Sequence, residues 1–275
     1  MPRSLPMLSA MGFLAIGFSL SVQPVRADSF LPNVSNLNFL DYTGAAPKDY
    51  FTNVKPVGWT GGTGLIFIDA PGTADNGSYL SVYKPFPANS PAGGNFVEAD
   101  GNPSFESGFN QTITGLTPGQ TYTLSFYQAA SQQLGFATGL PTTERWIVSL
   151  GTAGLSLKGG GPTDPTYGPT DIYYSTDASA DIVASSLMTT PSAGVTSWQY
   201  VSVNLTADST TDLLSFLAWG DNGSTINLPP IVFLSGVNST KVSSTPEPAS
   251  MFSLGIALAG LGFSLAIRHR RNTRV

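Results

Sequence analysis

Hydrophobic and polar residues alternate most regularly near the middle of the chain, over residues 121–127. Tyr122, Leu124 and Phe126 fall on one face of an extended segment, and the residues between them are Thr and Ser. A period of two in residues that favour extended structure predicts a strand with one buried face.

A turn signal precedes this strand. Pro118 and Gly119 fit the two central positions of a type II turn, because Pro fixes φ at about −65° and Gly accepts a positive φ. Residues 111–114 alternate just before that turn. They are therefore predicted to form the hairpin partner of residues 121–127.

Further short runs of β-forming residues stand between breaks that are rich in Gly and Pro. They predict strands at residues 65–69, 79–83, 96–100, 145–150, 198–205, 213–219 and 231–237. Strong helical periodicity is absent from the sequence of residues 29–240. This cadence predicts an all-β ectodomain in which two antiparallel sheets pack as a jelly roll or β-sandwich.

Two stretches depart from simple alternation. Residues 213–219 are apolar on both faces, which a central strand covered on both sides explains best; an exposed apolar ligand face is the alternative. Residues 151–196 include Gly159-Gly160-Gly161-Pro162 and clusters of Asp, Ser and Thr. This region is predicted to be a long surface excursion with a strand near residues 182–188.

Charge and composition exclude several functions. The chain has 275 residues, and all 17 acidic residues lie between Asp28 and Glu247, together with six of the 12 basic residues, which gives that region a formal charge of −11. Such a surface repels phosphate backbones and argues against nucleic-acid binding. The sequence has no Cys, and its one His, His269, lies near the C-terminus. Disulfides, thiolate metal sites and His-based catalysis in the ectodomain are thereby excluded.

The N-terminal residues have the pattern of a secretion signal. Arg3 precedes an apolar run over residues 8–22, and Val25-Arg26-Ala27 places small residues where signal peptidase requires them. We predict cleavage between Ala27 and Asp28. A retained membrane anchor is the alternative.

The C-terminal residues have the pattern of a membrane span. Ala249 to Ile267 are 19 residues without a charge, which at about 1.5 Å per residue nearly cross a hydrocarbon core of about 30 Å. A basic cluster follows directly and consists of Arg268, Arg270, Arg271 and Arg274, with His269 among them. The positive-inside rule places this end in the cytoplasm and the ectodomain outside.

Pro246-Glu247-Pro248 stands directly before this apolar segment. The tripeptide, the predicted helix and the arginine cluster together resemble the PEP-CTERM sorting signal of exported bacterial proteins. The resemblance implies an exosortase as processing partner, cleavage near the tripeptide, and release or transfer to the cell surface, in bacteria that make exopolysaccharide and biofilm matrix. The predicted parts are then a signal peptide (1–27), a β-sandwich ectodomain (28–240), a linker with the motif (241–248), a transmembrane helix (249–267) and a basic cytoplasmic tail (268–275).

Several strings in the ectodomain resemble galactose-binding-domain-like jelly rolls found beside such tails. They include Phe96-Val97-Glu98-Ala99-Asp100-Gly101 and Leu228-Pro229-Pro230-Ile231-Val232-Phe233-Leu234. Such domains often end in Leu-Asp-Gly-Val, whereas this chain has Leu234-Ser235-Gly236-Val237. No cofactor or metal site is predicted, and a structural calcium ion is left open, with Ser235 standing where that carboxylate would be.

The ectodomain offers three kinds of candidate site. The candidates for a glycosidase pair are Glu98, Asp100, Glu106 and Glu144, with Glu98 and Asp100 predicted on the same face of one strand. Carboxylates at surfaces and in turns are commoner, and the chain is predicted not to be an enzyme. The candidates for holding calcium stand at predicted strand ends and are Asp69, Asp75, Asp100 and Asp171. Trp59 and Trp219 stand beside Gly-rich loops and are predicted to stack on sugar rings, whereas Trp146 and Trp198 are predicted to pack in the core.

These observations predict an exported cell-surface or matrix protein, processed by signal peptidase and an exosortase and held transiently by one membrane helix. A carbohydrate-binding or structural role in exopolysaccharide or biofilm follows as the functional prediction. The alternatives are a purely structural or adhesive surface protein without a small ligand, and a secreted glycan hydrolase that uses carboxylates.

Overall fold

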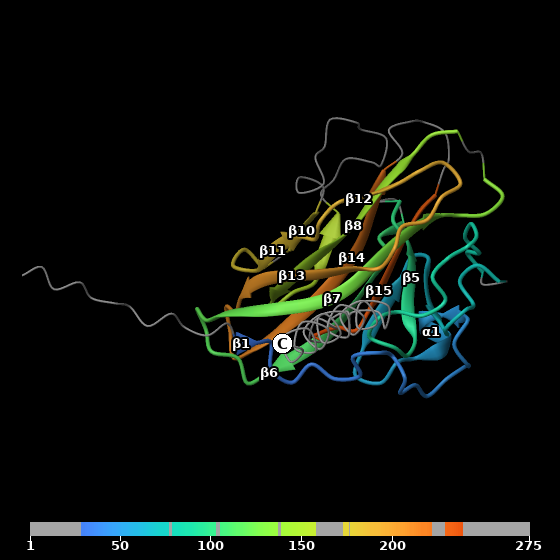
Figure 1. Cartoon of the computed structure of the whole chain (residues 1–275). Helices are drawn as coiled ribbons and strands as arrows, with labels where there is room; N and C mark the ends of the chain where they lie inside the picture. Colours follow the sequence, from blue (N-terminus) through green and yellow to red (C-terminus); the bar gives the residue numbers. More distant parts are fainter. Residues whose placement is uncertain are drawn as a thin grey trace, which may run out of the picture.

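Two β-sheets packed face to face make up most of the structure (Figure 1). The computed structural model describes residues 29–76, 79–102, 105–136, 139–157, 173–175, 177–221 and 229–238. Within these residues the regular structure is almost entirely strand, and the short helix α1 spans Phe51–Val54. The all-β prediction for the ectodomain is confirmed.

The first sheet contains seven strands in the order β1-β7-β15-β5-β4-β2, with β13 beside β7. Their bounds are β1 (Ser29–Phe30), β2 (Asp49–Tyr50), β4 (Ile66–Asp69), β5 (Phe96–Asp100), β7 (Thr121–Gln132), β13 (Gln199–Thr206) and β15 (Pro230–Ser235). All pairs are antiparallel except β1 with β7, which is parallel. Most neighbouring strands in this sheet are far apart in the sequence, so the sheet forms by long-range pairing.

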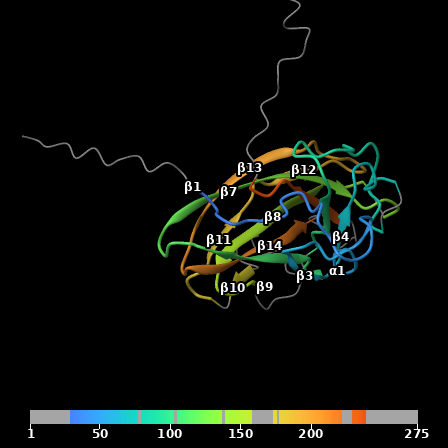
Figure 2. The same cartoon turned by 90° about the horizontal axis from the view of Figure 1, so that it is seen from below.

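The second sheet contains six strands in the order β11-β8-β14-β6-β3, with β12 beside β8. Their bounds are β3 (Thr60–Thr63), β6 (Gly108–Thr114), β8 (Thr142–Gly151), β11 (Asp181–Ala184), β12 (Met188–Thr190) and β14 (Thr211–Asp221). A separate short pair, β9 (Leu155–Leu157) and β10 (Tyr173–Ser175), lies on the outer side of this sheet (Figure 2).

The predicted hairpin between residues 111–114 and 121–127 is wrong. β6 pairs with β14 and β3 in the second sheet, whereas β7 pairs with β13 and β15 in the first. The predicted turn is present, since Gly119 has a φ of 75° and the N–H of Gln120 donates to the carbonyl of Thr117. The chain crosses from one sheet to the other here because both strands bury their apolar faces against the same core.

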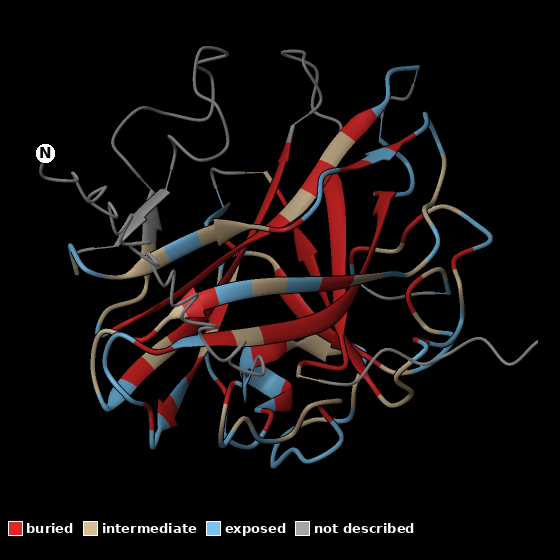
Figure 3. Cartoon of the chain, turned by 60° about the vertical axis from the view of Figure 1, so that its left-hand side comes forward, coloured by how far each residue is buried: buried red, intermediate tan, exposed pale blue. Residues whose placement is uncertain are grey.

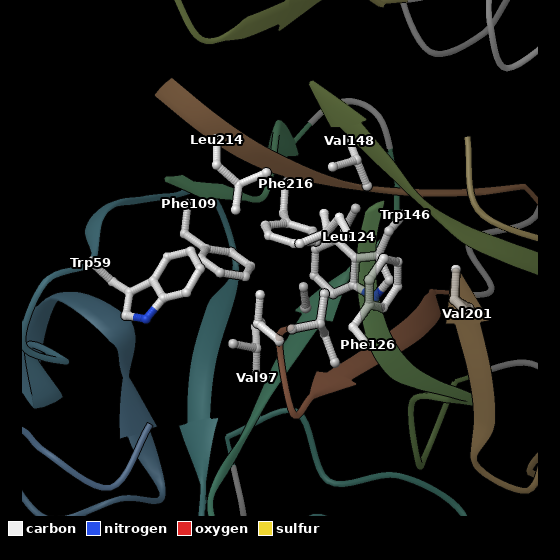
Figure 4. Packing of buried hydrophobic residues seen from close by; sticks show 14 of the residues in the cluster. Trp59, Val97, Phe109, Leu124, Phe126, Trp146, Val148, Val201, Leu214 and Phe216 are labelled. Atoms are coloured by element: carbon white, nitrogen blue, oxygen red, sulfur yellow. The ribbon is translucent and has the colours of Figure 1, made fainter. Parts of the chain in front are cut away.

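The main core lies between the two sheets. Phe109 and Phe216 from the second sheet stack at 5.1 Å between ring centroids, and Phe126 from the first meets Phe216 edge-on at 5.5 Å (Figure 4). Buried residues follow the strands, while exposed residues gather in the connections (Figure 3). Aromatic burial of this size is the main source of stability in a domain without disulfides.

A second, smaller core covers the outer face of the first sheet. Phe67, Phe96 and Phe233 point outward from their strands, and Leu80, Val82 and Phe86 of the segment after β4 pack on them. Residues 79–83 therefore form part of this covering segment and not a strand, with one isolated bridge from Val82 to Gln133. Their apolar residues have the pattern of a strand because they are buried against a sheet face.

β14 is a central strand, as predicted from its apolar residues on both faces. It lies between β8 and β6, and its residues from Leu214 to Gly220 are all buried. Leu214 and Phe216 enter the main core, whereas Leu217 and Trp219 pack with Ile147 on the outer side. The alternative of an exposed apolar ligand face is therefore wrong for this strand.

Candidate functional site

Trp59 lies in the core. Its side chain is 5% exposed, and its ring lies 5.5 Å from that of Phe39 and 5.1 Å from that of Phe109. Figure 4 shows Trp59 beside Phe109. Its Nε1 donates to the carbonyl oxygen of Asn36 at 3.3 Å. Gly58, with a φ of 82°, makes the turn that precedes it. The expectation that a loop edge exposes Trp59 is wrong, and sugar binding by this ring stays a prediction.

Trp219 is also covered, on the outer side of the second sheet. Its side chain is 6% exposed, and the guanidinium carbon of Arg145 lies 5.3 Å from the centre of its ring. Ile147 and Leu217 pack beside it. A guanidinium over an indole face is a favourable cation–π contact, and it occupies a face that a sugar would need. The binding role predicted for Trp219 stays a prediction.

Trp146 packs in the core, as predicted. It is fully buried, its Nε1 donates to the carbonyl oxygen of Phe233 at 3.1 Å, and its ring meets Phe109 edge-on. Trp198 lies just before β13 and packs in the smaller core against Phe86.

Two of the candidate catalytic carboxylates lie on different faces of the sandwich. Glu144 alternates along β8 so that it shares the inward face with Trp146. Glu98 shares the outward face of β5 with Phe96, which belongs to the smaller core. The first sheet therefore stands between Glu98 and Glu144, and these two do not form a glycosidase pair.

Burial strongly raises the pKa of the Glu144 carboxyl group. Its pKa is raised to about 8 by burial, against the opposing effect of hydrogen bonds with Thr142 and Thr190. The hydroxyl of Thr190 lies 2.9 Å from Oε2. The group is therefore protonated at neutral pH, and it takes part in a buried polar network at one end of the core.

A second set of buried carboxyl groups lies on the outward face of the first sheet. Asp69, Glu98 and Asp100 are each at most 1% exposed. Burial raises the pKa of Asp69, opposed by contacts with Glu98, Thr73 and Lys48, and burial raises the pKa of Asp100 to about 7. The N–H of Asn102 donates to Asp100 Oδ1 at 2.8 Å. Glu98 and Asp100 do share a face of one strand, as predicted.

No group of three or more metal-ligating side chains gathers within the described residues. Of the calcium candidates, Asp75 accepts a hydrogen bond from the backbone N–H of Phe86 at 3.0 Å, and Asp171 lies outside the described residues. At the position where the jelly rolls that the sequence resembles often carry Asp, the hydroxyl of Ser235 donates to the carbonyl oxygen of Asn95 at 3.3 Å, and Asn95 Nδ2 donates to that of Phe39 at 2.8 Å. Neutral hydrogen bonds hold this corner together.

The sequence does not reveal an aromatic cluster in which one ring, that of Tyr79, is exposed. Tyr79 is 63% exposed, and its ring lies 5.8 Å from that of Phe67 at an interplanar angle of 22° and 5.1 Å from that of Tyr50. Three aromatic side chains from β2, β4 and the segment after β4 thus meet at one edge of the first sheet. The signal available was Tyr79 within a polar stretch, but only the pairing of β2 with β4 brings Tyr50 and Phe67 together.

The residues predicted to sort the protein lie outside the described residues. These are Ala27 and Asp28, Pro246, Glu247 and Pro248, the apolar segment 249–267, and Arg268, Arg270, Arg271 and Arg274. In the part of the chain that the structure describes, the helix found is too short to traverse a bilayer. The boundaries predicted for these parts stay predictions.

Comparison with known proteins identifies the C-terminal motif. Residues 244–271 match the family model described as the PEP-CTERM protein-sorting motif, which confirms the resemblance seen in the sequence. Among curated proteins, no match to this chain was found. The chain therefore carries a sorting motif of this kind at its C-terminal end.

Solved structures with similarity to this chain include carbohydrate-binding modules. TmCBM61 in complex with β-1,4-galactotriose is 12% identical, covers 70% of this chain and 97% of its own, and has a TM-score of 0.32. The CBM22-1–GH10 modules of Clostridium thermocellum xylanase 10B with xylohexaose are 12% identical over 72% of this chain and 28% of theirs, with a TM-score of 0.33. A CBM4 structure is 16% identical over 62% of this chain and 83% of its own, with a TM-score of 0.26. At TM-scores this low, no ligand or site is transferred from these proteins.

Proposed function

We propose that this chain is an exported surface protein that an exosortase processes and whose β-sandwich holds extracellular polysaccharide. The observation that carries the proposal is the sorting motif at residues 244–271. In the sequence the motif follows the sandwich, and the first 27 residues of the chain have the pattern of a secretion signal.

Each part of the C-terminal segment has a physical role in this proposal. The apolar residues 249–267 would enter the bilayer, and the arginines from Arg268 onward would keep the tail in the cytoplasm. Pro246 and Pro248 would disfavour helix at the junction and would keep Glu247 in an extended segment. An extended segment at the outer face of the membrane that the helix enters would be accessible to a processing enzyme.

The sandwich supplies the external role. Charged residues make up only 11% of the sequence, and the exposed aromatic side chains of the sandwich offer apolar faces for sugar rings. The separation of Glu98 from Glu144 favours a binding or structural role over glycan hydrolysis. An adhesive role without a small ligand remains the alternative to polysaccharide binding.

Changing the motif tests the sorting step. In the host, a variant with Pro246, Glu247 and Pro248 replaced by Ala is expected to stay in the membrane fraction with its basic tail attached, while the wild type reaches the surface. A control variant with Lys241, Val242 and Ser243 replaced by Ala changes the same number of residues before the motif and is expected to be sorted normally. Normal surface delivery of the motif variant would contradict the proposal.

Polysaccharide retention tests the external role. The full-length chain, purified in mild detergent, is expected to co-sediment with the host's purified extracellular polysaccharide. Absence of retention, together with normal matrix in a deletion strain, would favour the adhesive alternative.

A further inference from the structure

We infer that the exposed ring of Tyr79 is a stacking surface for a sugar ring of a neutral polysaccharide. The inference rests on the proposed function, because it assigns a site and a ligand class to the polysaccharide that the sandwich holds. Three observations carry it: a ring held by two other aromatic rings, an ammonium group near the segment that carries it, and the negative net charge of the ectodomain.

The ring of Tyr79 is supported and yet accessible. It is the most exposed of the large hydrophobic side chains in the described residues, while Phe67 beneath it is only 1% exposed. Phe67 and Tyr79 stack at 22°, and Tyr50 contacts both of them, at 4.4 Å and 5.1 Å between ring centroids. A ring already held by two others loses little side-chain freedom when a ligand packs on it.

The backbone fixes the segments that carry these rings. Tyr50 is paired with Phe67 across β2 and β4, and the N–H of Lys48 donates to the carbonyl oxygen of Ile68 at 2.6 Å. The ammonium group of Lys48 donates to the carbonyl oxygen of Asn76 at 3.0 Å. This bond ties the residues just before Tyr50 to those just before Tyr79. The three rings of Tyr50, Phe67 and Tyr79, which we call the platform, are therefore held in a defined arrangement.

One charged donor is held near the segment that carries Tyr79. Lys48 is exposed, and its ammonium group contacts the carbonyl oxygen of Asn76, three residues before Tyr79. Sugar hydroxyls hydrogen-bond to ammonium, amide and carboxylate groups, while the C–H face of a pyranose packs on an aromatic ring. An exposed ring near a hydrogen-bond donor therefore suits a pyranose better than a purely apolar ligand does.

Charge selects the class of polysaccharide. The region from Asp28 to Glu247 has a formal charge of −11, so the net charge of the protein disfavours binding of a polyuronate. A neutral polymer meets no such repulsion. Trp59 and Trp219 do not compete for this role in the structure, because their rings are covered by Phe109 and by Arg145.

Affinity electrophoresis of the full-length chain in mild detergent tests the inference. The neutral probes are xylan, β-1,4-galactan and curdlan, and the anionic probe is alginate. The variants are Tyr79→Ala and Tyr79→Gln, which remove the ring, and Tyr79→Phe, which keeps it. Tyr42→Ala is the matched control, because Tyr42 is 39% exposed and lies outside the three-ring cluster.

We expect retention by at least one neutral polymer, about tenfold weaker in Tyr79→Ala and Tyr79→Gln, with melting temperatures unchanged. Tyr79→Phe and Tyr42→Ala are expected to bind like the wild type. Unchanged retention in both ring-deleting variants would overturn the site while leaving polysaccharide binding intact. Stronger retention on alginate would overturn the neutral class, and no retention of the wild type on any polymer would overturn the inference together with the proposed binding function.

Discussion

At the scale of single residues, the buried acids determine how this protein responds to pH. Glu144 and Asp100 have ordinary pKa values of 4.5 and 3.8, which burial raises to about 8 and about 7. At a pH between the ordinary and the raised pKa of each group, the folded protein therefore binds more protons than the unfolded chain. Stability contributed by these groups is fully present at low pH and is lost as the pH rises toward 8.

Glu144→Gln tests this pH dependence. The amide keeps the shape of the side chain and can accept the hydrogen bond from Thr190, but it cannot ionise. We expect the fall in melting temperature between pH 5 and pH 8 to be smaller in Glu144→Gln than in the wild type. Because each pKa unit corresponds to about 1.4 kcal/mol, the change should be measurable by calorimetry.

Glu106→Gln is the control for this experiment, since Glu106 is exposed. It is expected to leave the pH dependence of the melting temperature unchanged. A Glu144→Gln variant with the same pH dependence as the wild type would show that Glu144 is not a buried, protonated acid.

At the scale of elements, the covering segment after β4 acts as a third layer. Phe86 lies 4.1 Å from Phe233 between ring centroids and 6.0 Å from Trp198, so it joins this segment to the first sheet and to the residues before β13. The layer buries Asp69 and Phe67 and also positions Tyr79. Its packing therefore matters both for stability and for the proposed sugar platform.

Phe86→Ala is expected to lower the free energy of unfolding by about 3 kcal/mol, because it leaves a cavity between Phe233 and Trp198. Urea unfolding followed by tryptophan fluorescence measures this. Leu187→Ala, at an exposed position between β11 and β12, is the control and should cost less than about 0.5 kcal/mol. Equal, small effects of both substitutions would contradict a packed third layer.

The elements also show what sequence patterns can and cannot predict. Period-two alternation predicted the start of β7 at residue 121, although the strand continues to Gln132, and a short run of β-forming residues predicted β5 with its observed bounds. The partner of β6 was missed because alternation reveals which face is buried but not which strand lies alongside. The strand predicted at residues 79–83 failed for a similar reason, since burial against a sheet face resembles burial within one.

The candidate site was predictable only in part. Asp100 and Glu98 were placed on one face correctly, because the side chains of a strand alternate. Trp59 was misplaced because a turn at Gly58 directs the indole inward, which no local pattern reveals. The platform at Tyr79 depends on contacts with Phe67 and Tyr50, residues that lie 12 or more positions away in the sequence.

At the scale of the whole molecule, the two ends of the described chain meet on one strand. Leu31 donates its N–H to the carbonyl oxygen of Thr123 on β7, and Asn238 Nδ2 donates to the carbonyl oxygen of Leu31 at 2.8 Å. Seven residues separate Asn238 from Pro246 and span at most about 25 Å when fully extended. The proposed membrane helix would thus hold this end of the sandwich close to the bilayer.

The arginine cluster tests the proposed orientation. Replacing Arg268, Arg270, Arg271 and Arg274 with Gln removes the charges that hold the tail in the cytoplasm, and we expect processing at the motif to be largely lost. Immunoblotting of cell fractions with an antibody to the sandwich measures this. As a control, Lys55→Gln with Lys84→Gln removes positive charge from the sandwich and should leave processing unchanged. Efficient processing of the tail variant would contradict the proposed orientation.

Intact mass spectrometry of the protein recovered from the cell surface tests the central claim most directly. The account predicts a chain that begins at Asp28 and ends near Pro246-Glu247-Pro248, without the apolar segment and the arginines. Recovery of the full 275-residue chain from the cytosol, with both ends intact, would contradict it.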